Sequence, residues 1–251
     1  MPNSALLSHL LPGLPCLCLK ETASTNADAR TWLLKGALHG SFVIADRQRA
    51  GRGRMGRSFV SDDGGMYLSI ILKTQLPAGQ LTSLCAVAVR HAVLTLTGIA
   101  LDIKWVNDLL RHGRKVCGIL CEGIWEGETM LGAIAGIGLN ISQKFFPPEL
   151  ASVADSLFPD GNAPVEKEHF VAEIIREILS LLPKVPAHMQ EYRAACITLG
   201  QEVEWEKDNC LMHGIAESID DYGALSIRTD NGLILLSAGE VSLHTVNARI
   251  K

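Results

Sequence analysis

Apolar residues recur along this chain with two different spacings, and the spacing separates helices from strands. A three-and-four repeat at positions 81, 84, 85, 88, 89, 92, 93 and 96 predicts a long helix with one buried face, ending near Gly98. The same repeat predicts a helix over 170–182. Shorter helices are predicted over 24–35, which begins with capping residues, and in a segment that ends near residue 197.

Short continuous apolar runs predict strands between these helices. They cover residues 41–45, 66–72, 101–105, 115–125 and 130–139. Strands that alternate with helices in this way are typical of an α/β core.

The pattern changes after Leu199, where helical repeats stop and short β-rich runs alternate with turns. The turns fall at residues 220–223 and 230–232, and the Asn231-Gly232 pair between apolar runs is typical of a hairpin. Four or five short strands predict a small barrel. We therefore expect two domains, residues 1–198 and residues 199–251.

Composition excludes several classes of protein. The 251 residues are 47% hydrophobic and 20% charged, enough to build a core without disulfide or metal support. The net charge of −4 argues against a general nucleic-acid coat. No run of 18 apolar residues predicts a membrane span, and Pro12 and Pro15 interrupt the apolar start, so we expect no secretory signal. Seven cysteines without a CxxC pair indicate a reducing cytosol, and the apolar run around Cys117 and Cys121 indicates that these two are small buried residues rather than metal ligands.

The densest candidate for chemistry is a loop rich in arginine and glycine. Five arginines lie within residues 47–57, with glycines at 51, 53 and 56. Glycines let a backbone approach a ligand closely, and guanidinium groups bind phosphate or carboxylate. The spacing fits neither a dinucleotide fingerprint nor a Walker loop. An anion-binding loop, a solvated flexible loop and a single-stranded RNA contact all remain open.

Three further motifs follow along the chain. Each has an ordinary structural explanation when taken alone: a turn cap, a solvated lysine at a strand start, and a glycine-relaxed strand end. They are Lys104-Trp105-Val106-Asn107-Asp108, Arg114-Lys115-Val116-Cys117-Gly118-Ile119-Leu120 and Gly136-Ile137-Gly138-Leu139-Asn140.

Together with Ser24-Thr25-Asn26 and the arginine-glycine loop, and in this order, the motifs resemble the biotin protein ligases. The resemblance extends from about residue 20 to the terminal barrel. It implies an α+β fold, in which a mixed β-sheet catalytic domain flanked by helices carries a small C-terminal SH3-like β-barrel. It also implies a biotin–[acetyl-CoA-carboxylase] ligase. Such an enzyme uses ATP to form biotinyl-5′-AMP and then transfers biotin to a lysine of a carrier domain.

The resemblance assigns roles residue by residue, with Lys115 and Arg54 as catalytic residues and Asp108 as a weak ligand of Mg²⁺. The implied biotin site comprises Ser24, Thr25, Asn26, Gln48, Gly51, Arg52, Gly53, Arg54, Trp105, Lys115, Gly118 and Leu120. The implied ATP site comprises Arg54, Arg57, Asn107, Asp108, Lys115 and Asn140. His244 stands where some members carry an arginine that reaches ATP, which puts a nucleotide role of the barrel in doubt.

The implied partner is the biotin carboxyl carrier protein, a subunit of acetyl-CoA carboxylase, or an equivalent carrier domain. Only 23 residues precede Ser24, too few for a DNA-binding helix-turn-helix domain, so we expect a cytoplasmic ligase without DNA or membrane contacts. Whether it forms a homodimer is left open. The nearest alternative is a lipoate–protein ligase, and an arginine-glycine nucleic-acid-binding protein is the alternative from another class. The net charge and the lack of aromatic residues interleaved with the arginines argue against the latter.

Overall fold

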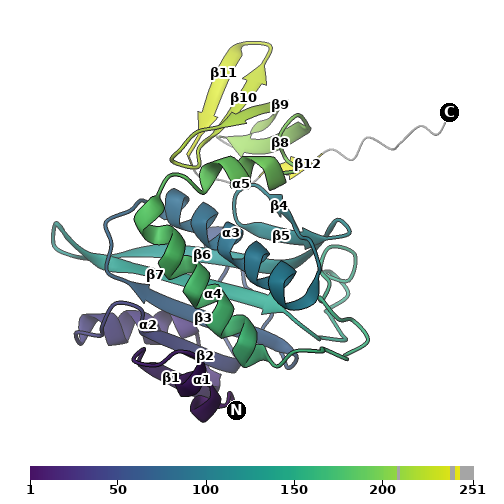
Figure 1. The fold of residues 1–251 in the computed structure, drawn as a ribbon. Coiled ribbons are helices and arrows are strands. Elements are labelled where there is room, and N and C mark those ends of the chain that lie inside the picture. The colour runs from purple at the N-terminus through teal and green to yellow at the C-terminus, as the bar shows by residue number, and fades with distance from the viewer. Residues whose placement is uncertain (208–209, 238–240, 244–251) are drawn as a thin grey trace.

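The computed structural model describes the chain except for residues 208–209, 238–240 and 244–251. Within the described residues, a large mixed sheet is covered by helices and a smaller antiparallel sheet follows it (Figure 1). The helices are α1 (Ser4–Leu10), α2 (Thr25–Leu34), α3 (Ala78–Thr97), α4 (Lys167–Leu181) and α5 (Met189–Ala195). Short 3₁₀ turns occur at Arg54–Gly56 and Leu182–Lys184.

The large sheet has the strand order β1-β2-β3-β7-β6-β5-β4 in the described chain. Its first pair is parallel and the remaining neighbours are antiparallel, so the sheet is mixed as expected. The strands are β1 (Cys16–Thr22), β2 (Phe42–Gln48), β3 (Gly65–Leu72), β4 (Asp102–Lys104), β5 (Asp108–Arg111), β6 (Arg114–Glu126) and β7 (Thr129–Asn140).

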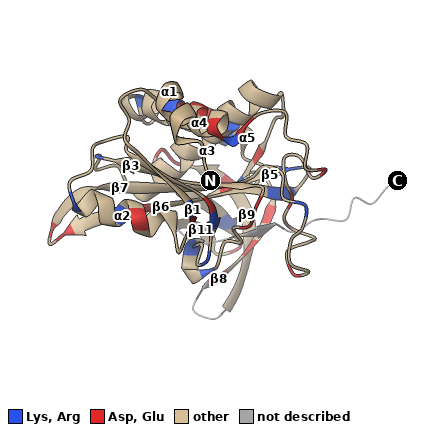
Figure 2. Cartoon of the chain, turned by 90° about the horizontal axis from the view of Figure 1, so that it is seen from below, with Lys and Arg blue, Asp and Glu red and all other residues tan. Residues whose placement is uncertain are grey.

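Helices cover the two faces of this sheet unequally, as Figure 2 shows, with α3, α4 and α5 on one side and α2 on the other. Side chains alternate along a strand. Ala133, Ala135 and Ile137 of β7 therefore belong to the large core under α3, whereas Ile134 packs with α2. The sheet thus has a helical face and an α2 face.

Helix α3 is the centre of the helical face. Its apolar repeat buries residues along most of its length, and Gly98, with φ 72°, ends it in the left-handed conformation. By length and composition α3 is apolar enough to cross a membrane, but 67% of that window is buried inside the protein. It is therefore the core helix that the sequence predicted.

The smaller sheet has the order β11-β10-β9-β8-β12 among the described residues. Its antiparallel strands confirm the β-rich C-terminal unit, and the Asn231-Gly232 turn joins β10 and β11. Its turn at 220–223 meets the part of the chain that carries the large sheet, where Gly223 O accepts a hydrogen bond from Trp105 Nε1 at 2.9 Å. The strands are β8 (Glu202–Lys207), β9 (Cys210–Ile219), β10 (Leu225–Thr229), β11 (Gly232–Leu236) and β12 (Ser242–Leu243).

Three elements were absent from the predictions made from the sequence. Helix α1 and strand β1 lie in the apolar start, which proline interrupts; Pro12 and Pro15 fall in the connection between them. Strand β5 begins at Asp108 of the Asn107-Asp108 pair and is only four residues long, so its apolar residues Leu109 and Leu110 show no period. His244 lies outside the described residues, and the structure therefore does not address its role.

Candidate functional site

A cavity of about 650 Å³ lies on the α2 face of the large sheet. Alternate residues of β7 form part of its wall, because Gly136, Gly138 and Asn140 share the face that Ile134 presents to α2. Strand β6 lies alongside, with Gly118 opposite Gly138 and Leu120 opposite Gly136. Two residues along a strand span about 7 Å, so this wall is about 13 Å long from Gly136 to Asn140.

Glycine is required in this wall because other side chains lie directly on it. A Cβ atom at Gly138 would come within 2.5 Å of the Phe59 ring, and one at Gly118 within 2.9 Å. A Cβ atom at Gly136 would come within 2.2 Å of Asn26 Oδ1. The sequence alone explains the glycines of the 136–140 motif as a loosening of the strand end. In the structure they form a surface on which the side chains of Asn26 and Phe59 pack.

The start of α2 forms one end of the cavity. Ser24, Thr25 and Asn26 are all buried and line it. The Thr25 backbone N–H donates to Gln48 Oε1 at 2.8 Å, which joins α2 to the end of β2. Gln48 Nε2 in turn donates to Ser61 Oγ at 2.9 Å. This end of the cavity is polar and held by hydrogen bonds.

The arginine-glycine loop folds back on itself between β2 and β3. Gly53 N–H donates to Arg57 O at 2.7 Å, and Phe59 N–H donates to Gly51 O at 2.9 Å. Gly51 has no room for a side chain, because a Cβ atom would lie 2.4 Å from Phe59 O. The loop presents Arg52, Arg54 and Arg57 to the cavity.

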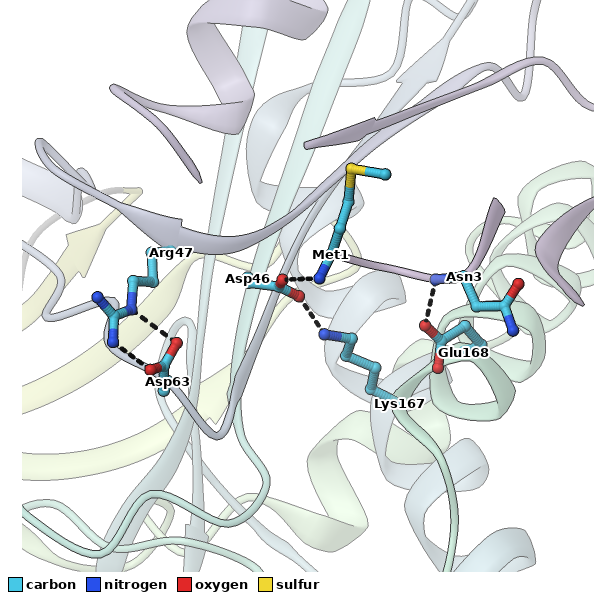
Figure 3. Close-up of polar contacts among 7 residues, drawn as sticks. All are labelled: Met1, Asn3, Asp46, Arg47, Asp63, Lys167 and Glu168. Atoms are coloured by element: carbon cyan, nitrogen blue, oxygen red, sulfur yellow. Dashed lines mark hydrogen bonds and ion pairs between the residues drawn. The ribbon is translucent and has the colours of Figure 1, made fainter. Parts of the chain in front are cut away.

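Ion pairs hold the two ends of this loop, as Figure 3 shows. Arg47, near the end of β2, pairs with Asp63, which lies shortly before β3, and this arginine holds the pKa of the Asp63 carboxyl below its usual range. Asp46 pairs with Lys167 of α4. Burial alone would raise the pKa of Asp46, but hydrogen bonds from Lys167 and the Met1 amine outweigh burial and lower it. The base of the loop is therefore fixed to the sheet and to α4.

Lys115 lies at the other end of the cavity. Its Nζ is 2.7 Å from Asp108 Oδ1 and 5.7 Å from the centre of the Phe59 ring. The backbone of Lys115 is fixed by the segment that follows β7, since its N–H donates to Val153 O and its carbonyl accepts from Asp155 N, both at 2.8 Å. A cation and a carboxylate are thus held side by side next to an aromatic ring.

Two asparagine side chains stand near this end. Asn107 Nδ2 donates to Ile119 O at 3.0 Å, and Asn140 Nδ2 donates to Asp155 O at 3.0 Å. Asn140 Oδ1 is buried and has no hydrogen-bond partner within the described residues. Asn140 lines the cavity, whereas this oxygen is enclosed by surrounding protein atoms.

The structure brings the site residues inferred from the sequence into one cavity. All of them line it except Gly51, which packs behind the loop against Phe59 O and Ser61. Their roles toward a ligand stay predictions.

The sequence did not reveal several residues of this cavity. Phe59 is a single aromatic residue in a polar loop, and only its place over two glycines identifies it. Gly136 had a signal, because it alternates with Gly138 on one strand face. Leu150, Val153 and Ala154 line the cavity from an irregular segment, for which the sequence gives no period.

Comparison with known proteins gives two family matches. The Biotin/lipoate A/B protein ligase family matches residues 18–140, and the Biotin protein ligase C terminal domain matches residues 198–244. The Biotin--[acetyl-CoA-carboxylase] ligase of Paracoccus denitrificans is 34% identical, over 89% of this chain and 98% of the relative. The chain belongs to the biotin protein ligase family. The family resemblance seen in the sequence is therefore confirmed.

Other biotin protein ligases agree with this assignment. The Bifunctional ligase/repressor BirA of Bacillus subtilis is 33% identical, over 88% of this chain and 71% of the relative. The structure of the biotin protein ligase from Aquifex aeolicus in complex with biotin and ATP superposes with a TM-score of 0.79. It is 27% identical, over 91% of this chain and 98% of that chain. The expected fold class, with a mixed sheet and a β-rich C-terminal unit, is confirmed.

Proposed function

We propose that this protein is a biotin–[acetyl-CoA-carboxylase] ligase, which uses ATP to attach biotin to a lysine of a biotin carboxyl carrier domain. One observation carries the proposal: a single cavity joins the buried polar end at α2 to the Lys115–Asp108 pair and three arginines. An uncharged polar end suits a urea ring, and cations suit a carboxylate and phosphates. The related biotin protein ligase from Aquifex aeolicus binds biotin and ATP, the two ligands that this cavity suits.

Two steps complete the reaction. A biotin carboxylate oxygen attacks the α-phosphorus of ATP, and the bond to pyrophosphate breaks, leaving biotinyl-5′-AMP. The amine of the carrier lysine then attacks the acyl carbon, and AMP leaves. Both reactants of the first step are anions, so their approach requires positive charge held in place. Lys115 and Arg54 supply that charge in our assignment.

The remaining roles follow from the positions in the cavity. Ser24, Thr25, Asn26 and Gln48 bind the urea ring, with Gly118 and Leu120 on the wall beside it. Asn140 contacts the nucleotide, and Arg57 holds phosphate. Phe59 separates the two ends and, with the loop, excludes water from the adenylate.

Magnesium fits this site only with the help of the nucleotide. Among the described residues that line the cavity, Asp108 provides the carboxylate, and no group of three or more His, Cys, Asp or Glu side chains there forms a metal cage. Magnesium is commonly held by one or two carboxylates together with substrate phosphates. Asp108 would therefore hold Mg²⁺ jointly with ATP, and the ion would offset phosphate charge.

The division of the chain also belongs to the proposal. Residues 1–198 carry the chemistry, and residues 199–251 form the SH3-like unit, whose turn at Gly223 is bonded to Trp105. We place the enzyme in the cytoplasm, with a carrier domain as its protein partner.

The direct test is transfer to a carrier. The protein is incubated with ATP, Mg²⁺, biotin and a purified carrier domain, and the mass of the carrier is measured. We expect one biotin to be added per carrier, on a single lysine. No mass change, with a carrier that another biotin ligase does modify, would reject the proposal.

A further inference from the structure

Behind the polar end of the cavity lies a chain of hydrogen bonds that reaches residues not assigned above. Ser69 is completely buried on β3, and Glu122 is half-buried on β6. Neither lines the cavity, but both bond to residues that do. The direction of each hydrogen bond in this chain follows from the chemistry of its ends.

The first end is Asn26, whose amide can have only one orientation. One amide atom lies 2.6 Å from Glu122 Oε2 and 3.3 Å from Leu120 O. A carboxylate and a backbone carbonyl only accept hydrogen bonds, so this atom is the nitrogen. The oxygen, Oδ1, therefore faces Ser69 Oγ at 2.6 Å.

The second end is Gln48, whose amide is also fixed. Its Oε1 accepts from the Thr25 backbone N–H, and its Nε2 donates to Ser61. Oε1 is therefore also the atom that lies 3.0 Å from Thr25 Oγ1. Both ends of this chain of hydrogen bonds, Asn26 Oδ1 and Gln48 Oε1, are therefore acceptors.

Between these two ends there are fewer protons than oxygen–oxygen contacts. Asn26 Oδ1, Ser69 Oγ, Thr25 Oγ1 and Gln48 Oε1 form three contacts of 2.6, 2.8 and 3.0 Å, and only the two hydroxyl groups carry protons. The shortest contact takes the Ser69 proton, because two bare oxygens at that distance repel. Thr25 then gives its own proton to Ser69 or to Gln48. In either case its oxygen accepts no hydrogen bond from these partners.

We infer that Glu122 is a positioning residue that, acting through Asn26 and Ser69, holds the Thr25 hydroxyl as an open acceptor toward the cavity. The group it selects is an N–H donor, such as a urea nitrogen. With Asn26 rotated by half a turn, its nitrogen would donate to Ser69, Ser69 to Thr25, and Thr25 to Gln48. The Thr25 hydroxyl would then be satisfied within the protein and would bind an N–H group less well.

The inference rests on the proposed function, and substitution of Glu122 tests it. Glu122→Lys replaces the nearer acceptor of the Asn26 amide by a donor, which outweighs the longer contact to Leu120 O and rotates the amide. We expect the KM for biotin in pyrophosphate release to rise about tenfold, the scale of one neutral hydrogen bond, with kcat within about threefold. Glu122→Gln keeps an acceptor for Asn26 and should leave KM within about twofold.

Controls separate positioning from charge. Glu126→Lys changes the same charge at an exposed position of the same strand and should leave KM unchanged. If Glu122→Lys does not fold, Glu122→Met leaves Asn26 held by Leu120 O alone, and KM should rise about threefold. A KM within twofold of the parent for every folded Glu122 variant, or an equal rise in Glu122→Gln and Glu122→Lys, would overturn the inference.

Ligand analogues test the unmodified protein. In two analogues of biotin, one or the other ureido N–H is replaced by oxygen, which only accepts hydrogen bonds. We expect the parent to bind at least one of them tenfold or more weakly than biotin, and Glu122→Lys to discriminate less. Equal binding of both analogues and biotin by the parent would overturn the inference. No pyrophosphate release with biotin itself would instead reject the proposed function.

Discussion

The two faces of the large sheet use the same strands for different purposes. On the helical face, apolar side chains of α3 and α4 pack against the sheet, such as Leu84 of α3 and Ile174 of α4, both completely buried. The α2 face replaces such side chains with Gly118, Gly136 and Gly138, and the space is lined by polar and charged groups. Stability therefore comes chiefly from one face and chemistry from the other, and substitutions should separate the two properties.

The largest effect is expected on the helical face. Leu84→Ala should lower the free energy of unfolding by about 2–5 kcal/mol, because a buried cavity replaces the side chain. Denaturant titration measures this loss. At a temperature where the variant is folded, its KM for biotin should match that of the parent. A raised KM with unchanged stability would show that the helical face does not serve stability alone.

The next effect belongs to the α2 face. Lys115→Ala should slow adenylation by about 10²-fold, the scale of one fixed charge-stabilising donor. Stability should change little, since the Lys115 side chain is 32% exposed at the start of a strand. Rates of pyrophosphate release and thermal melting measure the two quantities together.

Two controls sharpen this prediction. Lys115→Arg should also be slow, because a planar guanidinium does not replace a compact ammonium, whereas Lys73→Ala, at an exposed position, should be normal. Biotinyl-5′-AMP supplied chemically should partly restore transfer by Lys115→Ala. A near-normal adenylation rate in folded Lys115→Ala would place the active site elsewhere.

The helical face should also have its own dependence on pH. Burial, followed by the charge of Arg193, lowers the pKa of His188 to about 4, and its Nε2 lies 2.9 Å from Ser83 Oγ. The unfolded chain takes up this proton near pH 6.5 and the folded chain near pH 4, so stability is lost as pH falls through that range.

Replacement of the histidine isolates this contribution. Between pH 7 and pH 4, the parent should lose roughly 2–3 kcal/mol more than His188→Gln, measured by denaturant titration. His9→Gln, at an exposed position, should follow the parent. Activity per folded molecule should not distinguish the variants. Parallel stability curves for the parent and His188→Gln would contradict the prediction.

The smallest effect concerns motion within the α2 face. The start of α2 is buried, whereas Met55 at the tip of the arginine-glycine loop is 75% exposed. Biotin with ATP should therefore slow amide hydrogen exchange across residues 49–57 severalfold, and change residues 25–29 less. Equal changes in both segments, or none in the loop, would show that the loop does not close over the adenylate.

Much of this architecture could be read from the sequence, because long apolar repeats and joint motifs carry it. The repeat ending at Gly98 predicted α3, and the joint motifs predicted residues that line one cavity. Strand β5 was not predicted, because four residues are too few to show a period. Phe59 and Glu122 were not predicted for another reason. Each contacts residues that are distant in the sequence, and such contacts leave no local pattern.

Pyrophosphate release by the unmodified protein, with ATP, Mg²⁺ and either biotin or lipoate, tests the biotin-specific site most directly. A cavity whose polar end is built from Thr25, Asn26 and Gln48 should accept the urea ring of biotin and reject the apolar dithiolane ring of lipoate, because buried polar groups would lose their partners. We predict pyrophosphate release that requires biotin and Mg²⁺, and none above background with lipoate. Equal release with the two acids would contradict the biotin-specific site.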